Sequence, residues 1–369
     1  MSSSTSKMPA IKPRQTIRGP TEVRGVVHLP DERQIITCSK DGSLRLWDLE
    51  NGTQIGEDWR DGNEGVWSTA LSPNGKMIAT GSGGYYDIRL WDVKTRKVIA
   101  RCTGHTAAGV VEALCWSADG NRIASGSWDG TSRVWDVKSR KNILTIKTGH
   151  QWGSAVTYSP DSSKLATGGN KQNVARIWDA TTGKLLNTLK HDWMVYSLVW
   201  MSDGKKLISG SYGLIRIFDT ATWQQIAILE GHTDFVYAIS LSPNNRLLAS
   251  ASGDSTARLW DLDTNLPVGP HLQHEHHHMN SAAFSRNGKV LVTTCKNNAY
   301  AWDVHAILKE AGLEDLLLIG PNIVSVNASA ALSLTMSAVR RQKTDSKRTQ
   351  LMNQEYSAHP ALRSTTSHF

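Results

Sequence analysis

The sequence predicts an all-β fold made of seven repeated units, and a recurring dipeptide is the main observation behind this prediction. Trp-Asp stands at 47–48, 91–92, 135–136, 178–179, 260–261 and 302–303, and Phe218-Asp219 fills the one gap. The intervals run from 40 to 44 residues. This period with this dipeptide is typical of four-stranded β-propeller blades. One such unit cannot cover its own apolar faces, so neighbouring units must stack.

Each unit also repeats the same order of strands and turns. An apolar strand ends in a turn such as 72–75, Ser-Pro-Asn-Gly, whose residues supply fixed or positive φ angles. A second strand follows, as at 122–127, and then a tight turn such as Asp129-Gly130, the preferred chemistry of a two-residue hairpin. The third strand ends at the Trp-Asp pair. The fourth is more polar, as expected for an outer edge strand.

The Trp-Asp pairs, together with Gly-His pairs at 104–105, 149–150 and 231–232, carry a family resemblance. Over residues 11–303 the chain resembles the WD40 repeat family, and its repeats are similar to those of fungal WD40 proteins. The resemblance implies a seven-bladed β-propeller, a closed ring that leaves only short, protected edges. Residues 11–17 precede Gly19-Pro20 as a fourth strand precedes the next Gly-His. We therefore expect them to complete the last blade, a closure found in the family.

Three further segments flank the predicted ring. Asp303 is placed to cap a short helix over 304–311 that ends at Gly312, so residues 304–318 are predicted to form a helical extension that seals the rim. Residues 1–10 are expected to be a disordered tail. Residues 319–369, which are basic and rich in Ser and Ala, are expected to be a second one.

The net charge of +8 comes entirely from the two ends of the chain. Residues 1–18 hold four basic and no acidic residues, and 340–369 hold six basic and two acidic ones. The rest carries 31 of each sign, which argues against a basic nucleic-acid-binding face. The four cysteines have no CxxC spacing and predict reduced thiols in the cytoplasm or the nucleus. No apolar run approaches the ~20 residues of a membrane span, and no secretory signal follows Met1.

Two units hold a His, a Ser, an Asp and a Trp in the same order, which raises the question of acyl-transfer catalysis. The two sets are His105, Ser125, Asp129 and Trp135, and His232, Ser250, Asp254 and Trp260. An active site is normally built once, and no nucleophile elbow accompanies either set. In the WD40 family these positions form a structural hydrogen-bond chain, and the resemblance implies the same here. We therefore predict no catalytic residues and no enzymatic activity.

The resemblance also implies a partner-binding surface on the narrow top of the ring. The family's contact positions lie near the start of each first strand and just before the turn Asp. Carried over to this chain, they are Trp67, Tyr86, Glu112, Trp128, Trp152, Tyr196, Tyr212, Phe235 and Tyr237. Exposed Trp and Tyr are enriched in binding hot spots, so we predict an aromatic crescent that binds a peptide with an apolar or cationic anchor. The alternative is that these rings pack against loops or a tail of the same chain.

Two other features are candidate sites. Histidines at 271, 274 and 276–278 precede the seventh unit, but a flexible loop gives no fixed ligand geometry, so we predict no metal and no cofactor. The basic run 340–348 is open between a nuclear import signal, an RNA-contacting tail and a solvated charged tail.

The sequence therefore predicts a protein–protein interaction scaffold or adaptor, a monomeric subunit of a larger assembly with protein or peptide partners and no membrane partner. The alternative is a nucleic-acid-associated or nuclear complex subunit that uses its basic tails, whose binding would depend steeply on salt. A ubiquitin-ligase substrate adaptor is not supported, because Lys94 and Lys138 stand where such family members prefer Arg. Fold alone does not decide among these functions.

Overall fold

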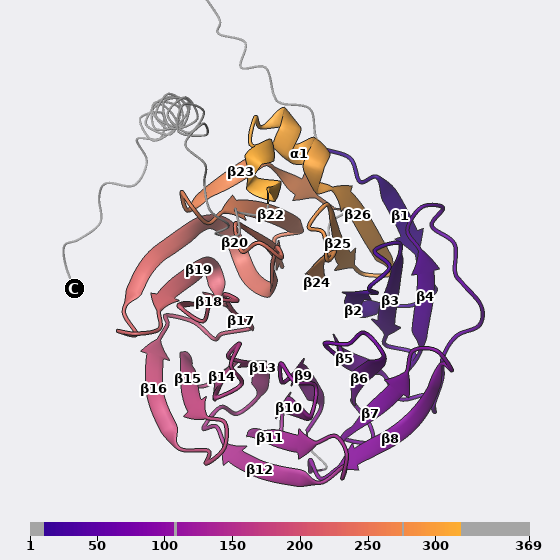
Figure 1. Ribbon diagram of the computed structural model, residues 1–369, viewed down its shortest axis with the longest axis vertical. Coiled ribbons are helices and arrows are strands. Elements are labelled where there is room, and N and C mark those ends of the chain that lie inside the picture. Colours follow the sequence, from indigo (N-terminus) through magenta and orange to yellow (C-terminus); the bar gives the residue numbers. More distant parts are fainter. Residues whose placement is uncertain (1–10, 107–108, 275–276, 319–369) are drawn as a thin grey trace, which may run out of the picture. The chain divides into compact units, whose positions relative to one another are not determined.

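The computed structural model describes residues 11–106, 109–274 and 277–318, which form a ring of seven antiparallel blades around a central channel (Figure 1). The first strand of each blade faces the channel, and the last lies at the outer rim (Figure 1). The blades follow one another in sequence order, as the repeat predicted, so the predicted propeller is confirmed. The tails predicted for 1–10 and 319–369 fall outside the described residues.

The strands follow the order that the sequence repeats predicted for each blade. Blades one and two contain β2 (Val23–His28), β3 (Gln34–Ser39), β4 (Leu44–Asp48), β5 (Val66–Leu71), β6 (Met77–Ser82), β7 (Asp87–Asp92) and β8 (Lys97–Thr103). Blades three and four contain β9 (Val111–Trp116), β10 (Arg122–Ser127), β11 (Thr131–Asp136), β12 (Asn142–Lys147), β13 (Gly153–Tyr158), β14 (Lys164–Gly169), β15 (Val174–Asp179) and β16 (Leu185–Lys190).

The remaining blades include one strand that serves two of them. Blades five and six contain β17 (Ser197–Trp200), β18 (Lys206–Gly210), β19 (Tyr212–Asp219), β20 (Gln225–Leu241), β21 (Leu247–Ser252), β22 (Thr256–Asp261) and β23 (Leu266–Gln273). The first half of β20 pairs with β19 and its second half with β21, so β20 is the outer strand of blade five and the inner strand of blade six. Blade seven contains β24 (Met279–Phe284), β25 (Val290–Cys295), β26 (Asn298–Asp303) and β1 (Gln15–Arg18).

Strand β1 closes the ring, as the sequence predicted. It pairs antiparallel with β26, from Gln15 opposite Ala301 to Arg18 opposite Asn298. The strand begins at Gln15 rather than at residue 11, since Pro13 has no N–H to donate to a ladder. Both ends of the propeller therefore belong to the same sheet.

The hydrophobic core is divided into seven clusters of buried side chains, each between two neighbouring blades. The aromatic residue of each Trp-Asp or Phe-Asp pair packs in the cluster shared with the preceding blade. Trp47 of blade one, for example, packs with Val292 and Ala299 of blade seven. Because each cluster draws on two blades, no blade buries its faces alone.

The same Trp side chain also ties two strands of its own blade together. In six blades its indole N–H donates to a Ser or Thr hydroxyl on the second strand. The pairs and distances are Trp47–Thr37 2.8 Å, Trp91–Thr80 2.9 Å, Trp135–Ser125 2.9 Å, Trp178–Thr167 2.9 Å, Trp260–Ser250 2.8 Å and Trp302–Thr293 2.8 Å. Phe218 of blade five has no such donor.

Blades three and six contain the hydrogen bonds that the family resemblance implied. His105 Nδ1 lies 2.8 Å from Asp129 and Nε2 lies 2.8 Å from Ser125. The corresponding distances from His232 to Asp254 and to Ser250 are both 2.7 Å. Since an ionised Asp only accepts, Nδ1–H donates to it and the Ser hydroxyl donates to Nε2.

Sequence reasoning missed two further histidines of this kind. His191 Nε2 lies 2.8 Å from Ser209 in blade five, and His274 Nε2 lies 2.9 Å from Thr293 in blade seven. The assignment of His274 to a flexible histidine loop was therefore wrong, because its ring is buried against Trp302. The spacing from histidine to hydroxyl, 18 to 20 residues in all four blades, was the available signal.

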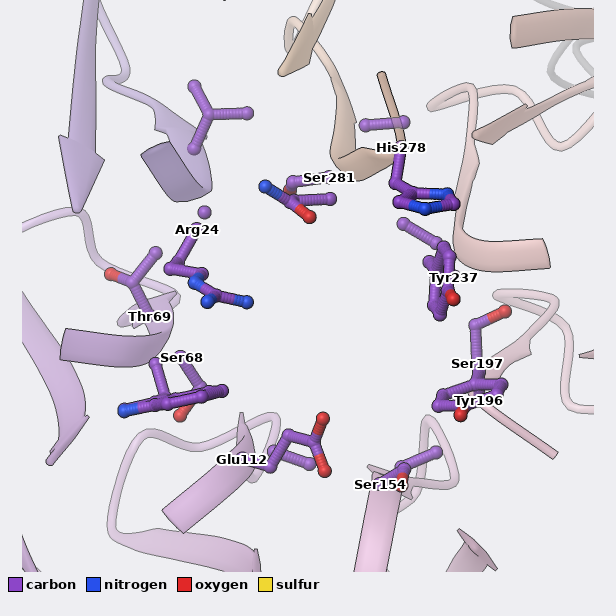
Figure 2. Close-up of a pocket in the computed structure, with 18 of the residues that line it drawn as sticks. Arg24, Ser68, Thr69, Glu112, Ser154, Tyr196, Ser197, Tyr237, His278 and Ser281 are labelled. Carbon is purple, nitrogen blue, oxygen red and sulfur yellow. The ribbon is translucent and has the colours of Figure 1, made fainter. Parts of the chain in front are cut away.

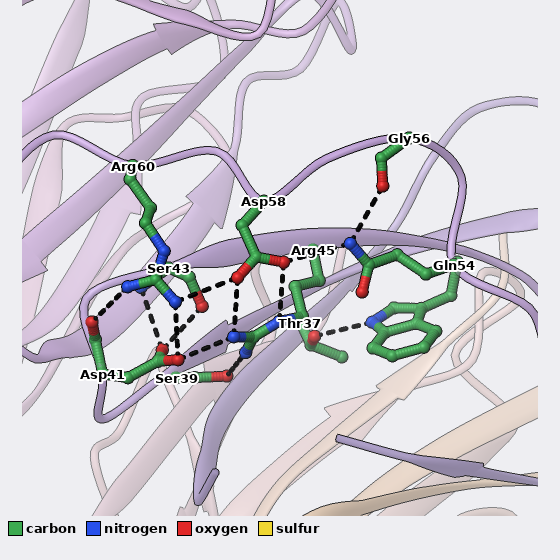
Figure 3. Close-up of polar contacts among 10 residues, drawn as sticks. Thr37, Ser39, Asp41, Ser43, Arg45, Gln54, Gly56, Asp58 and Arg60 are labelled. Atoms are coloured by element: carbon green, nitrogen blue, oxygen red, sulfur yellow. Dashed lines mark hydrogen bonds and ion pairs between the residues drawn. The ribbon is translucent and has the colours of Figure 1, made fainter. Parts of the chain in front are cut away.

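Blade one stabilises its turn Asp with arginine instead of histidine, because Pro20 stands where blades three to seven have His. Asp41 accepts from Arg45 at 2.6 Å and from Arg60 at 2.9 Å, and both arginines also reach Asp58 (Figure 3). Burial alone would raise the pKa of Asp41, but the hydrogen bonds from Arg45 and Ser43 outweigh it and hold the pKa well below its usual range. The fourth segment of this blade is reduced to two isolated bridges.

The C-terminal extension packs on blades six and seven. Helix α1 spans Val304–Glu310, and the Asp303 carboxylate caps it by accepting from the Ala306 N–H at 2.9 Å. Ile307 and Leu308 are buried in the cluster between these blades, which confirms the predicted short helix. A 3-10 helix, η1 (Glu314–Leu317), follows and is held by the Asn244 side chain, which donates to the Leu316 carbonyl at 2.7 Å. Within the described ranges, no helix is long and apolar enough to cross a bilayer.

Replacing Ile17 with Ala should destabilise the whole ring, because Ile17 is the buried residue by which β1 joins the core between blades seven and one. We expect a loss of about 2–5 kcal/mol in the free energy of unfolding, as for other large-to-small core changes, measured by urea denaturation. Thr16→Ala, at an exposed site on the same strand, is the control and should change the free energy by less than about 0.5 kcal/mol. Equal stabilities for the two variants would contradict this role of β1.

Lowering the pH from 7.5 to 5 should also destabilise the fold. Burial lowers the pKa values of His28, His150, His191 and His274 to about 4, from 6.5. Below pH 6.5 these histidines therefore become protonated in the unfolded chain, while they stay neutral in the folded chain. Each of these histidines should remove on the order of 1 kcal/mol of unfolding free energy per pH unit, until the pH reaches about 4.

Urea denaturation at pH 7.5, 6 and 5 tests this linkage. His274→Asn should show a shallower fall in stability with pH than the wild type, because it has one fewer buried group to protonate. His271→Asn replaces an exposed neighbour and should follow the wild-type slope. Parallel slopes for all three proteins would rule out His274 as a contributor.

Candidate functional site

Each blade contributes one side chain to the rim of the central channel, from the start of its inner strand. We call these seven residues the channel mouth: Arg24, Trp67, Glu112, Ser154, Tyr196, Tyr237 and Asn280. They line a cavity of about 780 Å³ (Figure 2). The residue before each of them is buried in its blade, so the mouth residue is the first on its strand to face the channel.

A β-bulge places the mouth residue in six of the seven blades. In β9, Val111 pairs with Ser127 and Ala113 with Gly126, so Glu112 has no partner across the ladder. The pairing skips Arg24, Trp67, Ser154, Tyr237 and Asn280 in the same way. The extra residue of a bulge leaves the regular alternation of the strand, which re-aims its side chain. The bulge between the first and second strands of each of these blades therefore determines which residue faces the channel.

Small residues follow the mouth residues and let neighbouring inner strands lie close together. They are Gly25, Ser68, Ala113, Ala155, Ser197, Ala238 and Ser281. Ser68 donates to the Val111 carbonyl of the next blade at 2.9 Å, and Ser197 donates to the Val236 carbonyl at 3.2 Å. Asn280 donates to the Val23 carbonyl at 2.8 Å, across the point where the ring closes. These bonds between blades fix the geometry of the mouth.

Three tryptophans form one side of the rim. The ring centroids of Trp67 and Trp128 lie 5.5 Å apart edge to face, and those of Trp128 and Trp152 lie 5.4 Å apart and stacked. The guanidinium of Arg24 lies 4.4 Å from the Trp67 ring centroid. Trp128 Nε1 donates to the Glu112 carboxylate at 2.6 Å. Burial raises the pKa of Glu112, against the opposing effect of this hydrogen bond.

A second aromatic group covers blades five and six. The Tyr196 ring lies 4.9 Å from Tyr237 and 5.2 Å from Phe235, and Tyr212 joins Phe235 at 5.0 Å. Trp193 extends the group, 5.4 Å from Tyr212. Burial raises the pKa of Tyr196 to about 12, and the neighbouring Tyr237 and Glu112 act in the same direction.

The structure brings together eight of the nine residues predicted for the top face, in two groups. Four of them line the cavity: Trp67, Glu112, Tyr196 and Tyr237. The other four lie at the rim: Trp128 and Phe235 contact the cavity-lining residues directly, and Trp152 and Tyr212 pack against Trp128 and Phe235. The predicted crescent consists of two arcs: among the described residues no ring contact joins the tryptophans of blades two to four to the aromatic group of blades five and six, and Ser154 lines the cavity between them.

Tyr86 is the ninth predicted residue, and the structure does not bring it together with the other eight. Among the described residues it neither lines the cavity nor takes part in the ring contacts of the two arcs. The inserted segment 83–86 lengthens the turn of blade two, and Tyr86 takes a positive φ of 54° there. The residue before Asp87 therefore does not occupy the position that Trp128 has before Asp129.

Two residues of the site escaped sequence reasoning. Trp193 stands two residues after His191, just as Trp152 stands two residues after His150, and this shared offset was the available signal. Arg24 follows a buried valine at the start of its strand, as Trp67 and Glu112 do. Only the pairing register shows that Arg24, rather than its neighbours, faces the channel.

The two His-Ser-Asp-Trp sets lie inside their blades and do not reach the mouth. Ser125 and Ser250 are 0 % exposed, so a substrate has no access to either hydroxyl. Burial alone would raise the pKa of Asp129, but the hydrogen bonds from His105 and Thr131 hold it well below its usual range. Within the described ranges no group of three or more metal-binding side chains gathers, and residues 275–276 of the histidine cluster lie outside them.

Comparison with known proteins places these features in a family. The family described as WD domain, G-beta repeat matches six segments of the chain. They are residues 11–48, 57–92, 96–136, 141–179, 183–219 and 223–261. Strands β24 to β26 of the last blade lie beyond these six segments, whereas β1, which completes that blade, falls within the first of them.

Relatives from Arabidopsis thaliana cover much of the ring. Protein FIZZY-RELATED 3 is 27% identical over 60% of this chain and 46% of its own length. Cell division cycle 20.4, cofactor of APC complex, is 30% identical over 59% of this chain and 51% of its own length. THO complex subunit 3 is 27% identical over 54% of this chain and 64% of its own length. The chain spans about half the length of the first two relatives. With its six matched repeats and seven blades, the chain belongs to the WD40 repeat family.

Proposed function

We propose that this chain is a non-enzymatic adaptor that binds peptide segments of other proteins at the channel mouth. The observation that carries the proposal is the pair of aromatic arcs around a concave opening. Trp152, Trp193 and Tyr212 keep 43%, 52% and 40% of their surface exposed on the rim. Large aromatic side chains are enriched in binding hot spots, where a partner removes them from water. A rigid scaffold lowers the entropy cost of presenting them.

The relatives support the same proposal. Two of them bear names that describe a cofactor or a subunit of a complex. We propose that this chain is likewise a monomeric subunit of a larger assembly, in the cytoplasm or the nucleus, where its four cysteines would stay reduced.

The described residues give no particular support to nucleic-acid binding. The cavity carries two acidic and two basic side chains, Glu22 and Glu112 against Arg24 and Lys296. A nucleic-acid site would need an excess of positive charge. The basic run 340–348 lies outside the described residues.

A second apolar surface on the ring provides the control for an experiment. Exposed aliphatic side chains lie on the outer strands of blades two to five: Ile99, Ile143, Leu185, Leu186, Ile226 and Ile228. Partners held at the mouth should not depend on them.

Affinity capture from native lysate, quantified by mass spectrometry, tests the proposal. The triple variant Trp128→Ala/Trp152→Ala/Tyr237→Ala should lose about tenfold or more of the bound partners, because truncated hot-spot residues each cost ~2 kcal/mol or more. Ile143→Ala/Leu186→Ala should retain them. Thermal unfolding shows beforehand that both variants are folded.

Retention by the triple variant together with loss in Ile143→Ala/Leu186→Ala would move the binding surface to the outer strands. Retention by both would remove the mouth and these strands as binding surfaces.

A further inference from the structure

Glu112 stands out among the charged groups of the mouth. Its carboxylate points into the cavity from β9 (Figure 2). It is hydrogen-bonded by the Trp128 N–H and by the Ser154 side chain. The charge of Arg24 acts on it from a distance, and among the described residues no ion pair within 4 Å joins it to a cation. Glu22, the other acidic residue of the cavity, is paired with Arg24 at 3.2 Å and with Lys40 at 3.9 Å. The mouth thus holds one carboxylate with unused capacity to accept.

The wall of the cavity formed by blades five and six is also suited to positive charge. Tyr196 and Tyr237 line it from blades five and six (Figure 2). Aromatic ring faces are negative and attract cations. Burial raises the pKa of both phenols, and the charges of Glu112 and Asp234 act in the same direction.

Arg24 shows how this chain accommodates a cation at the mouth. Its guanidinium lies over the Trp67 ring and pairs with Glu22. The blade-one side of the mouth therefore already has its own positive charge. The side formed by blades three to six has none among its cavity-lining residues.

We propose that the partner segment presents a Lys or Arg side chain, which enters the cavity and binds between the Glu112 carboxylate and the rings of Tyr196 and Tyr237. This inference rests on the proposed function and names the chemistry of its ligand. The cationic group forms an ion pair with Glu112 and a cation–π contact with the tyrosines, while the flanking peptide covers the tryptophan arc.

The other anchor chemistries fit less well. An acidic side chain would approach Glu112 and Asp234 with like charge. An apolar side chain would remove Glu112 from water and leave it without a cationic partner, which is costly. Among the three anchor chemistries, only a cation offsets the cost of removing the Glu112 carboxylate from water, because it forms an ion pair with it.

A displayed library of random seven-residue peptides, selected on the folded full chain, tests the inference directly because it samples every anchor chemistry. Selected peptides should be enriched in Lys or Arg at one position. Replacing that residue by neutral acetyl-lysine or citrulline should weaken binding about tenfold or more, and the two replacements show which cation is preferred.

Glu112→Gln should weaken the same peptides about tenfold or more, since it keeps the acceptor for Trp128 but removes the charge. Glu57→Gln neutralises an exposed carboxylate that does not line the cavity, and it should leave their affinity unchanged.

The outcomes separate this inference from the proposed function. Selected peptides that lack Lys and Arg, or that bind Glu112→Gln as tightly as wild type, yet are lost in Trp128→Ala/Trp152→Ala/Tyr237→Ala, would overturn the cationic anchor and leave peptide binding at the mouth intact. A selection that yields no peptides, or only peptides that this triple variant still binds, would overturn both.

Discussion

The Trp side chain at the end of each third strand is the interaction on which the rest of the ring depends. Its N–H holds the second strand of its own blade, and its ring packs in the core shared with the preceding blade. Phe218 separates the two roles: its ring still packs in the core between blades four and five, while the Ser209 hydroxyl bonds to His191 instead. Every blade therefore depends on its neighbour, and β1 extends that dependence around the whole circle.

This mutual dependence also produces the candidate site. Neighbouring inner strands come close through small residues such as Ala113 and Ala155, and a bulge just before each of these turns one side chain toward the channel. The geometry repeats around the ring, whereas the side chains it presents are of six different types: Arg24, Trp67, Glu112, Ser154, Tyr196, Tyr237 and Asn280. The positions that repeat from blade to blade stabilise the fold, whereas the mouth residues, which differ, determine which partner binds.

Much of this architecture could be predicted from the sequence because it rests on local, repeated patterns. The 40–44-residue period, the turn residues and the Asp303 cap were enough for the blades and the final helix. Local patterns gave the wrong placement of a residue where one blade departs from the others. The insertion in blade two displaces Tyr86, and the run of histidines before blade seven concealed that His274 is a buried member of it.

The sequence by itself determined the number of blades, the strand that closes the ring and most of the aromatic side chains on its rim, because each follows from spacing along the chain. Only the tertiary structure decided which residue of each inner strand faces the channel. A bulge is an offset between two paired strands, and no spacing within one strand records it. Tertiary structure also decided that Trp128 bonds to Glu112 and that Arg24 covers Trp67, since these contacts join side chains from different strands and blades.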